Sequence, residues 1–69
     1  MIPTKRQVKL LFNRAQSELG LNRTGTKDWC AASVHVTRRS IERCLSGERK
    51  MSGACYELLQ IKVDRLNNN

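Results

Sequence analysis

Apolar residues near the start of the chain recur at the spacing of an α-helix, with polar residues between them. They form one face: Val8, Leu11, Phe12, Ala15 and Leu19. Thr4 and Gln7 have the spacing of a capping box, with a hydroxyl at the N-cap and a Gln three residues later. Gly20 is a natural C-terminal stop. The pattern predicts a helix over residues 4–19.

Two shorter helices are predicted in the middle of the chain. Thr26 is the expected N-cap of the first, which ends near Val34. Thr37 is the expected N-cap of the second, which ends at residues 46–47, and residues 35–36 form a tight connection. The inner faces consist of Trp29, Cys30, Ala31 and Val34 in the first helix, and of Ile41, Cys44 and Leu45 in the second.

A final helix is predicted over residues 53–66, with Ser52 as its N-cap. Its apolar positions are Leu58, Leu59, Ile61, Val63 and Leu66. The polar tail over residues 67–69 is expected to fray. No segment alternates in the manner of a strand, so we expect an all-α domain of four helices that spans residues 1–69.

The charge of the chain narrows the class of partner. The 69 residues include 13 Lys and Arg against 6 Asp and Glu, for a net charge of +7. A net charge of this size lies near the upper limit of what solubility requires in so small a chain. It favours an anionic partner, and nucleic acid is the first candidate. No apolar run approaches the roughly 18 residues of a membrane span, and no signal-peptide pattern is present. Three cysteines, an odd number, fit a reducing compartment, so we expect a cytoplasmic protein.

Positive charge gathers on the third predicted helix. Because the apolar residues of this helix face inward, Arg38, Arg39 and Arg43 lie outward. One interpretation is an ordinary solvated face. The other is a surface that meets a negatively charged partner. Two short helices joined by a tight turn, with arginines on the second, are the arrangement of a DNA-binding helix-turn-helix over about residues 26–46.

The residues at the turn and after it follow an order found in one family. A hydrophobic turn residue is followed by Thr, two polar residues, Ser and an aliphatic residue, and the sequence SGE comes where the helix ends. This stretch, VTRRSIERCLSGER, resembles the lambda-repressor-like (Cro-type) helix-turn-helix regulators of phages and bacteria. The following stretch, MSGACYELLQIK, is similar to the helix that commonly comes next. Two positions depart from the family pattern. His35 stands where many members have Gly, which predicts a left-handed conformation there, and Cys44 stands where relatives often have Trp.

In this docking mode the helix over residues 37–45 enters the major groove, and its outward side chains contact bases. The candidates are Arg38, Arg39, Glu42 and Arg43. An arginine can donate two hydrogen bonds to guanine, worth about 1–3 kcal/mol of discrimination. Glu42 would accept from a cytosine amino group or orient a neighbouring arginine. The resemblance implies phosphate contacts by Lys27, Thr37 and Ser40, and by Arg49 or Lys50.

Other chemistry has weaker support in the sequence. Cys30, His35, Cys44 and Cys55 have the spacing C-x4-H-x8-C-x10-C, without the close pairs of structural zinc sites. No third residue orients a Cys-His nucleophile, and no glycine-rich phosphate loop is present. We therefore expect no metal, no cofactor, no small-molecule ligand and no enzymatic activity.

The resulting hypothesis is a small transcriptional repressor of the phage or mobile-element type, acting at the nucleoid of a bacterial cell and covering an operator, its own included. One small module contacts few base pairs, so we expect a homodimer on a palindromic double-stranded operator. The spare apolar residues of the last helix are candidates for the dimer contact: Tyr56, Leu58, Ile61 and Leu66. The alternatives are an antitoxin or inhibitor whose basic face covers an acidic protein, and an architectural DNA-binding excision factor.

Overall fold

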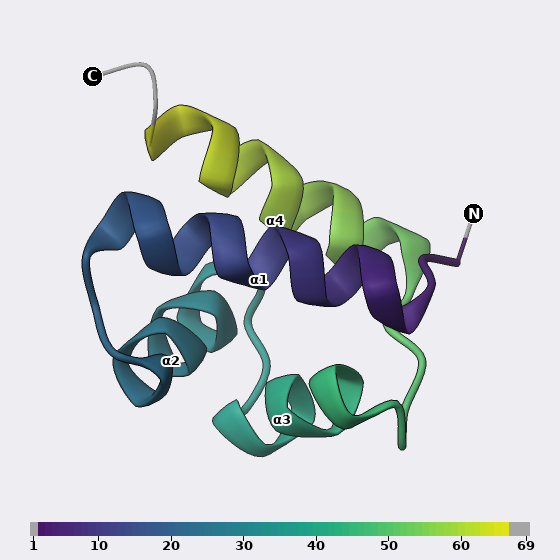
Figure 1. Cartoon of the computed structure of the whole chain (residues 1–69). Helices are drawn as coiled ribbons and strands as arrows, with labels where there is room; N and C mark the ends of the chain where they lie inside the picture. Colours follow the sequence, from purple (N-terminus) through teal and green to yellow (C-terminus); the bar gives the residue numbers. More distant parts are fainter. Residues whose placement is uncertain (1, 67–69) are drawn as a thin grey trace.

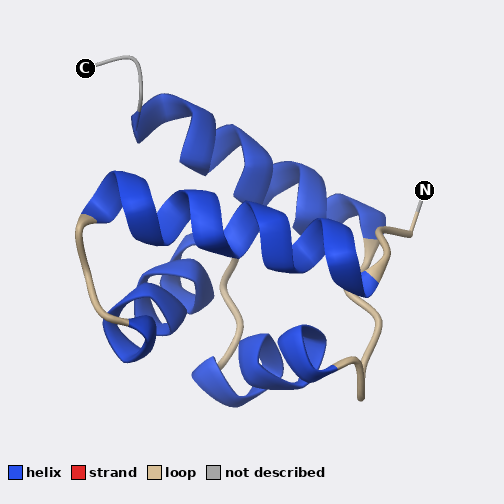
Figure 2. Cartoon of the chain, viewed as in Figure 1, coloured by secondary structure: helices blue, strands red, loops and turns tan. Residues whose placement is uncertain are grey.

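The computed structural model describes residues 2–66 and contains four α-helices joined by short connections (Figures 1 and 2). They are α1 (Lys5–Leu19), α2 (Arg23–Ser33), α3 (Arg38–Ser46) and α4 (Gly53–Leu66). No strand occurs within residues 2–66, so the all-α prediction is confirmed for this part of the chain. The predicted fraying of residues 67–69 lies outside the described residues. No described helix is long and apolar enough to cross a membrane.

α1 is the central element of a compact globule. α4 lies along one side of α1, while α2 and α3 contact α1 from the other side and also contact each other (Figure 1). The apolar faces of all four helices meet in one core around Phe12, which is 2% exposed, and Val63, which is fully buried. Trp29 and Tyr56 pack against this core while remaining partly exposed. The predicted inner faces are therefore confirmed, with Met51 as an additional buried residue from the loop before α4.

Local hydrogen bonds explain where α1 begins and ends. The backbone N–H of Gln7 donates to Thr4 Oγ1 at 3.1 Å, and the backbone N–H of Thr4 donates to Gln7 Oε1 at 2.8 Å. This is the predicted capping box. At the other end, Gly20 adopts a left-handed φ of 67° and its N–H donates to the carbonyl oxygen of Gln16.

The predicted start of α2 is wrong by one helical turn. Asn22, not Thr26, is the N-cap, and its side chain accepts from the backbone N–H of Gly25 at 2.7 Å. Thr26 is instead fully buried inside the helix, where its hydroxyl donates to the carbonyl oxygen of Asn22 at 2.8 Å. Asn and Gly are also typical turn residues, so the sequence favours a later start at Thr26. In the helix, however, a Cβ at Gly25 would stand 3.1 Å from the capping oxygen of Asn22, so glycine suits this first turn.

The connection between α2 and α3 contains four residues, and its conformation depends on His35. This residue has a φ of 60°, which is the only positive value at a non-glycine position within residues 2–66. Val34 before it is buried, and the N–H of Val36 after it donates back to the carbonyl oxygen of Ala31 at 3.0 Å. Thr37 then caps α3 by accepting from the N–H of Ser40. The predicted left-handed turn and the predicted cap are both confirmed.

Replacing His35 with glycine should stabilise the protein. A side chain in the left-handed region strains the backbone, while glycine adopts that region freely but loses more conformational entropy on folding. We expect His35→Gly to raise the free energy of unfolding by about 0.5–1 kcal/mol, measured by urea denaturation.

Gly20→Ala is the matched reciprocal variant. Gly20 has nearly the same φ, 67°, and a Cβ there would meet nothing within 4 Å, so backbone strain is the only cost. It should destabilise the protein by about 1 kcal/mol. If both His35→Gly and Gly20→Ala lowered the free energy of unfolding, the backbone of His35 would not be strained.

Candidate functional site

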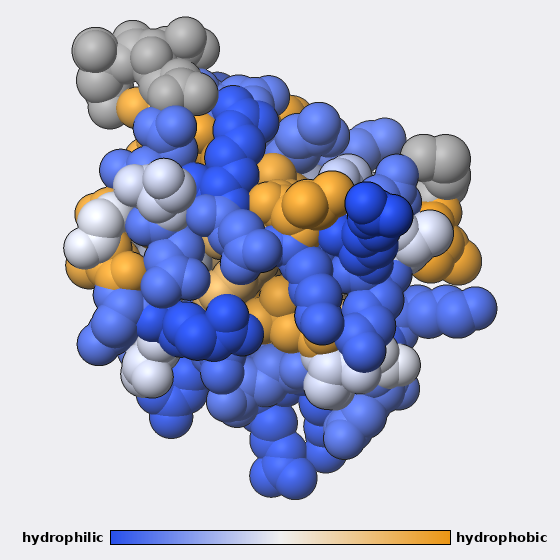
Figure 3. Space-filling model, viewed as in Figure 1, coloured by the Kyte–Doolittle hydropathy of each residue, from blue (hydrophilic) through white to orange (hydrophobic). Residues whose placement is uncertain are grey.

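The outer face of α3 carries the predicted base-contacting residues. Arg38, Arg39, Glu42 and Arg43 are all exposed. Ile41, Cys44 and Leu45 hold the helix against the rest of the protein, each no more than 7% exposed. In the space-filling view of Figure 3, the part of the surface over α3 is hydrophilic. Thr37, as N-cap, and the spacing of the three apolar residues together determine which side chains of α3 face solvent.

Two ion pairs join α3 to α2 across the angle between the helices. Arg38 Nη1 lies 3.7 Å from Asp28 Oδ1, and Lys27 Nζ lies 3.2 Å from Glu42 Oε2. Asp28, Arg38 and Glu42 are about half exposed, so each pair contributes less than about 1 kcal/mol to stability. The pairs nevertheless orient two of the four candidate base-contacting side chains toward the protein.

Arg39 and Arg43 are in a different situation. Within residues 2–66, neither side chain has a hydrogen-bonding or ion-pairing partner. They are four residues apart on α3, so they are neighbours along one stripe of the helix. Together with Glu42, Ser46 and Glu48 they line a shallow hollow of about 300 Å³. Of the four predicted base-contacting residues, these two are the ones whose side-chain donors are free to meet a ligand.

The predicted phosphate-contacting residues lie in three separate places. Thr37 and Ser40 sit at the start of α3, where Thr37 Oγ1 donates to Ser40 Oγ at 3.2 Å. Lys27 lies in the second turn of α2, because α2 begins earlier than predicted. Arg49 and Lys50 are exposed in the loop after α3, and the N–H of Arg49 donates to the carbonyl oxygen of Arg43 at 3.2 Å.

Sequence reasoning missed two cations on the other helices. Lys9 of α1 and Arg23 of α2 line a hollow beside α3, in company with Lys27. Lys9 lies outside the apolar pattern that predicts α1, and nothing in that pattern shows that α3 lies beside it. The predicted N-cap at Thr26 places Arg23 before the helix, whereas Arg23 is the first residue of α2. The spacing of Asn22 and Gly25 could have placed Arg23 in the helix. An N-cap side chain accepts from the backbone N–H three residues later, and Gly25 has that position relative to Asn22.

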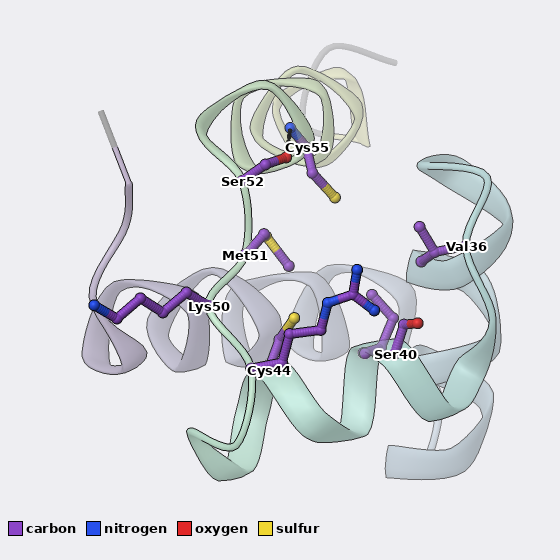
Figure 4. A pocket seen from close by; sticks show the side chains of 9 residues that line it. Val36, Ser40, Cys44, Lys50, Met51, Ser52 and Cys55 are labelled. Atoms are coloured by element: carbon purple, nitrogen blue, oxygen red, sulfur yellow. Dashed lines mark hydrogen bonds between the residues drawn. The ribbon is translucent and has the colours of Figure 1, made fainter.

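The cysteines are buried or half-buried thiols in the structure. Burial raises the pKa of Cys30 from 9.0 to about 11. Burial also raises the pKa of Cys44 and of Cys55, and the nearby charge of Arg49 partly opposes this in both. Cys44 and Cys55 line a cavity of about 150 Å³ between α3 and the start of α4, and Lys50 extends away from it (Figure 4). Within the described part of the chain, no three His, Cys, Asp or Glu residues are grouped so that they could hold a metal ion.

Comparison with known proteins assigns no relative to this chain: no protein-family model, no curated protein and no solved structure matches it. The case for a function therefore depends on the chemistry of the described surface.

The thiol of Cys30 should make stability fall at alkaline pH. Because its pKa is higher in the folded protein than in the unfolded chain, the folded state keeps a proton that the unfolded chain has released. This contribution is complete below pH 9.0 and is lost as the pH rises toward about 11. Urea denaturation should show a decline of up to about 1.4 kcal/mol per pH unit in that window.

Cys30→Ala is the control, since it removes the thiol while other groups continue to titrate. Its stability should decline less steeply over the same window. Equal slopes in the two proteins would show that Cys30 does not carry the effect.

Proposed function

We propose that α2, the four-residue connection and α3 form a helix-turn-helix, and that the protein binds double-stranded DNA in a sequence-specific manner. The observation that carries this proposal is the pair formed by Arg39 and Arg43. Both are exposed, both are without a partner in residues 2–66, and they lie one turn apart on a helix whose opposite face is anchored in the core. Unpaired arginines in this arrangement suit bidentate hydrogen bonding to guanine O6 and N7.

The solvated-face interpretation accounts less well for the charges around α3. A solvated face usually carries mixed charges that pair along the helix. Here two of the acids near α3 are already engaged with cations, since Asp28 lies near Arg38 and Glu42 lies near Lys27. Glu48 lines the same hollow as Arg39 and Arg43 but forms no ion pair with either of them. Arg39 and Arg43 are left as positive charge, with Arg49 and Lys50 beyond the end of the helix. An anionic partner would neutralise this excess.

Each candidate contact has a distinct role in the proposal. Arg39 and Arg43 contact bases directly. Arg38 and Glu42 would first have to leave their ion pairs with α2, so they contribute to base contacts only if binding exchanges those partners. Thr37, Ser40, Lys27, Arg49 and Lys50 would contact phosphates, which sets the register of the helix on the duplex and gives binding its dependence on salt.

A homodimer on a palindromic operator is part of the proposal. Ile61 on α4 is 50% exposed, and Leu58 lies three residues earlier on the same helix surface. Apolar residues in these positions support a contact between two copies through α4, which lies across α1 from α3 (Figure 1). A dimer of this kind would repress transcription by covering a promoter, its own included.

Affinity selection from a random pool of duplexes, followed by fluorescence anisotropy, tests the proposal. The protein should bind the selected duplex more tightly than a scrambled duplex of equal length. Arg39→Ala and Arg43→Ala should each lose about 1–3 kcal/mol of this discrimination, or roughly 5- to 150-fold. Arg6→Ala, an exposed arginine of α1 outside both hollows, is the matched control and should retain it.

Three outcomes would overturn the proposal in different ways. Full discrimination in both arginine variants would show that α3 does not contact bases. Binding without sequence preference would favour an architectural factor. Absence of any DNA binding would favour a module that interacts with an acidic protein.

A further inference from the structure

Three cationic side chains from two helices surround one hollow beside α3. Lys9 comes from α1, whereas Arg23 and Lys27 come from the first two turns of α2. The hollow has a volume of about 280 Å³, and α3 contributes the rest of its lining: Glu42, Leu45 and Ser46. It thus contains three positive groups and one negative group.

The fold holds these cations together despite their repulsion. Because α2 begins at Asn22 rather than Thr26, its first turn carries Arg23 four residues before Lys27, and the two share one stripe of the helix. The guanidinium carbon of Arg23 lies 5.3 Å from the centre of the Phe12 ring, a cation–π contact that directs Arg23 toward α1. Phe12 is three residues after Lys9 on α1. The buried ring therefore helps to keep Arg23 near Lys9.

The protein itself supplies little compensation for this charge. Glu42 is the one acid that lines the hollow, and it pairs with Lys27 at 3.2 Å. Within residues 2–66, Lys9 and Arg23 form no ion pair with an acid. The N-terminus of α2, an 11-residue helix, adds partial positive charge at the same end. A bound anion would relieve this repulsion.

The position of the hollow indicates which anion it suits. Glu42 and Ser46 line both this hollow and the adjoining one that contains Arg39 and Arg43. The cation cluster therefore flanks the outer face of α3 directly. With α3 in a major groove, one phosphate strand runs along each side of the helix, because the groove is bounded by the two backbones. The loop with Arg49 and Lys50 lies beyond the C-terminal end of α3, separate from this cluster.

We infer that Lys9, Arg23 and Lys27 form a binding site for a backbone phosphate of duplex DNA. This inference rests on the proposed function and extends it, since it makes α1 part of the DNA interface. Lys9 and Arg23 act as positioning residues: they contact a strand alongside the groove and carry no base preference. Lys27 joins them by exchanging Glu42 for a phosphate oxygen.

The salt dependence of binding tests the inference. The logarithm of the binding constant falls linearly with the logarithm of salt concentration, with a slope of about −0.9 for each phosphate neutralised on B-DNA. The Lys9→Ala/Arg23→Ala double variant should reduce the magnitude of this slope by up to about 0.9, the contribution of one phosphate, and each single variant should reduce it by less. The ratio of affinities for selected and scrambled duplexes should stay unchanged in all three.

Matched variants separate the site from general effects of charge and folding. Arg6→Ala removes one positive charge from an exposed position of α1 outside both hollows and should leave the slope unchanged. Arg23→Lys keeps the charge while weakening the contact with Phe12, so it should retain the slope. Thermal melts of every variant verify that the fold is intact.

The possible outcomes distinguish this inference from the proposed function. An unchanged slope in the Lys9→Ala/Arg23→Ala double variant, with sequence discrimination present, would overturn the phosphate site alone. A reduced slope in a protein that lacks sequence preference would support the site and refute the proposed specificity. An equal reduction in Arg6→Ala would overturn the site, because the effect would then come from net charge.

Discussion

The backbone conformation at His35 is the constraint on which the angle between α2 and α3 depends. The connection between these helices has only four residues, and a left-handed residue lets it reverse direction while Val34 stays in the core. The hydrogen bond from Val36 N–H to the carbonyl oxygen of Ala31 closes the turn. With the angle established there, the apolar residues of α3 pack inward, and Arg39 and Arg43 point to solvent as a consequence.

Electrostatic interactions divide the cations of this surface into two groups. Arg38 and Lys27 each face an acid across the α2–α3 angle, which stabilises the arrangement of the two helices modestly. Arg39, Arg43, Lys9 and Arg23 have no such acid within the described residues. The cations between α2 and α3 are therefore neutralised, and those farther out on the surface are not. This distribution suits a large anionic partner. This contrast supports the proposed function.

Much of the fold follows from local sequence signals. The capping box of α1, the caps at Thr37 and Ser52, and the apolar spacing of α3 are short-range features, so the sequence predicts them correctly. The start of α2 was mispredicted because both Asn22 and Thr26 can cap a helix, and burial of Thr26, a tertiary effect, decides between them. The outward face of α3 was predictable from periodicity. Its ion pairs with α2 and the approach of Lys9 to Arg23 were not, since they depend on how helices pack.

The central claim is that the surface formed by α3 and the adjoining starts of α1 and α2 binds DNA. A titration of the ¹⁵N-labelled protein with its selected duplex, followed by two-dimensional NMR, tests this claim most directly. The account predicts shifts concentrated at Arg39 and Arg43, with further shifts at Lys9 and Arg23 and little change at Arg6 and Ser17, which are exposed on α1 outside both hollows. Shifts that leave these four cationic residues unchanged, or none at saturating duplex, would contradict it.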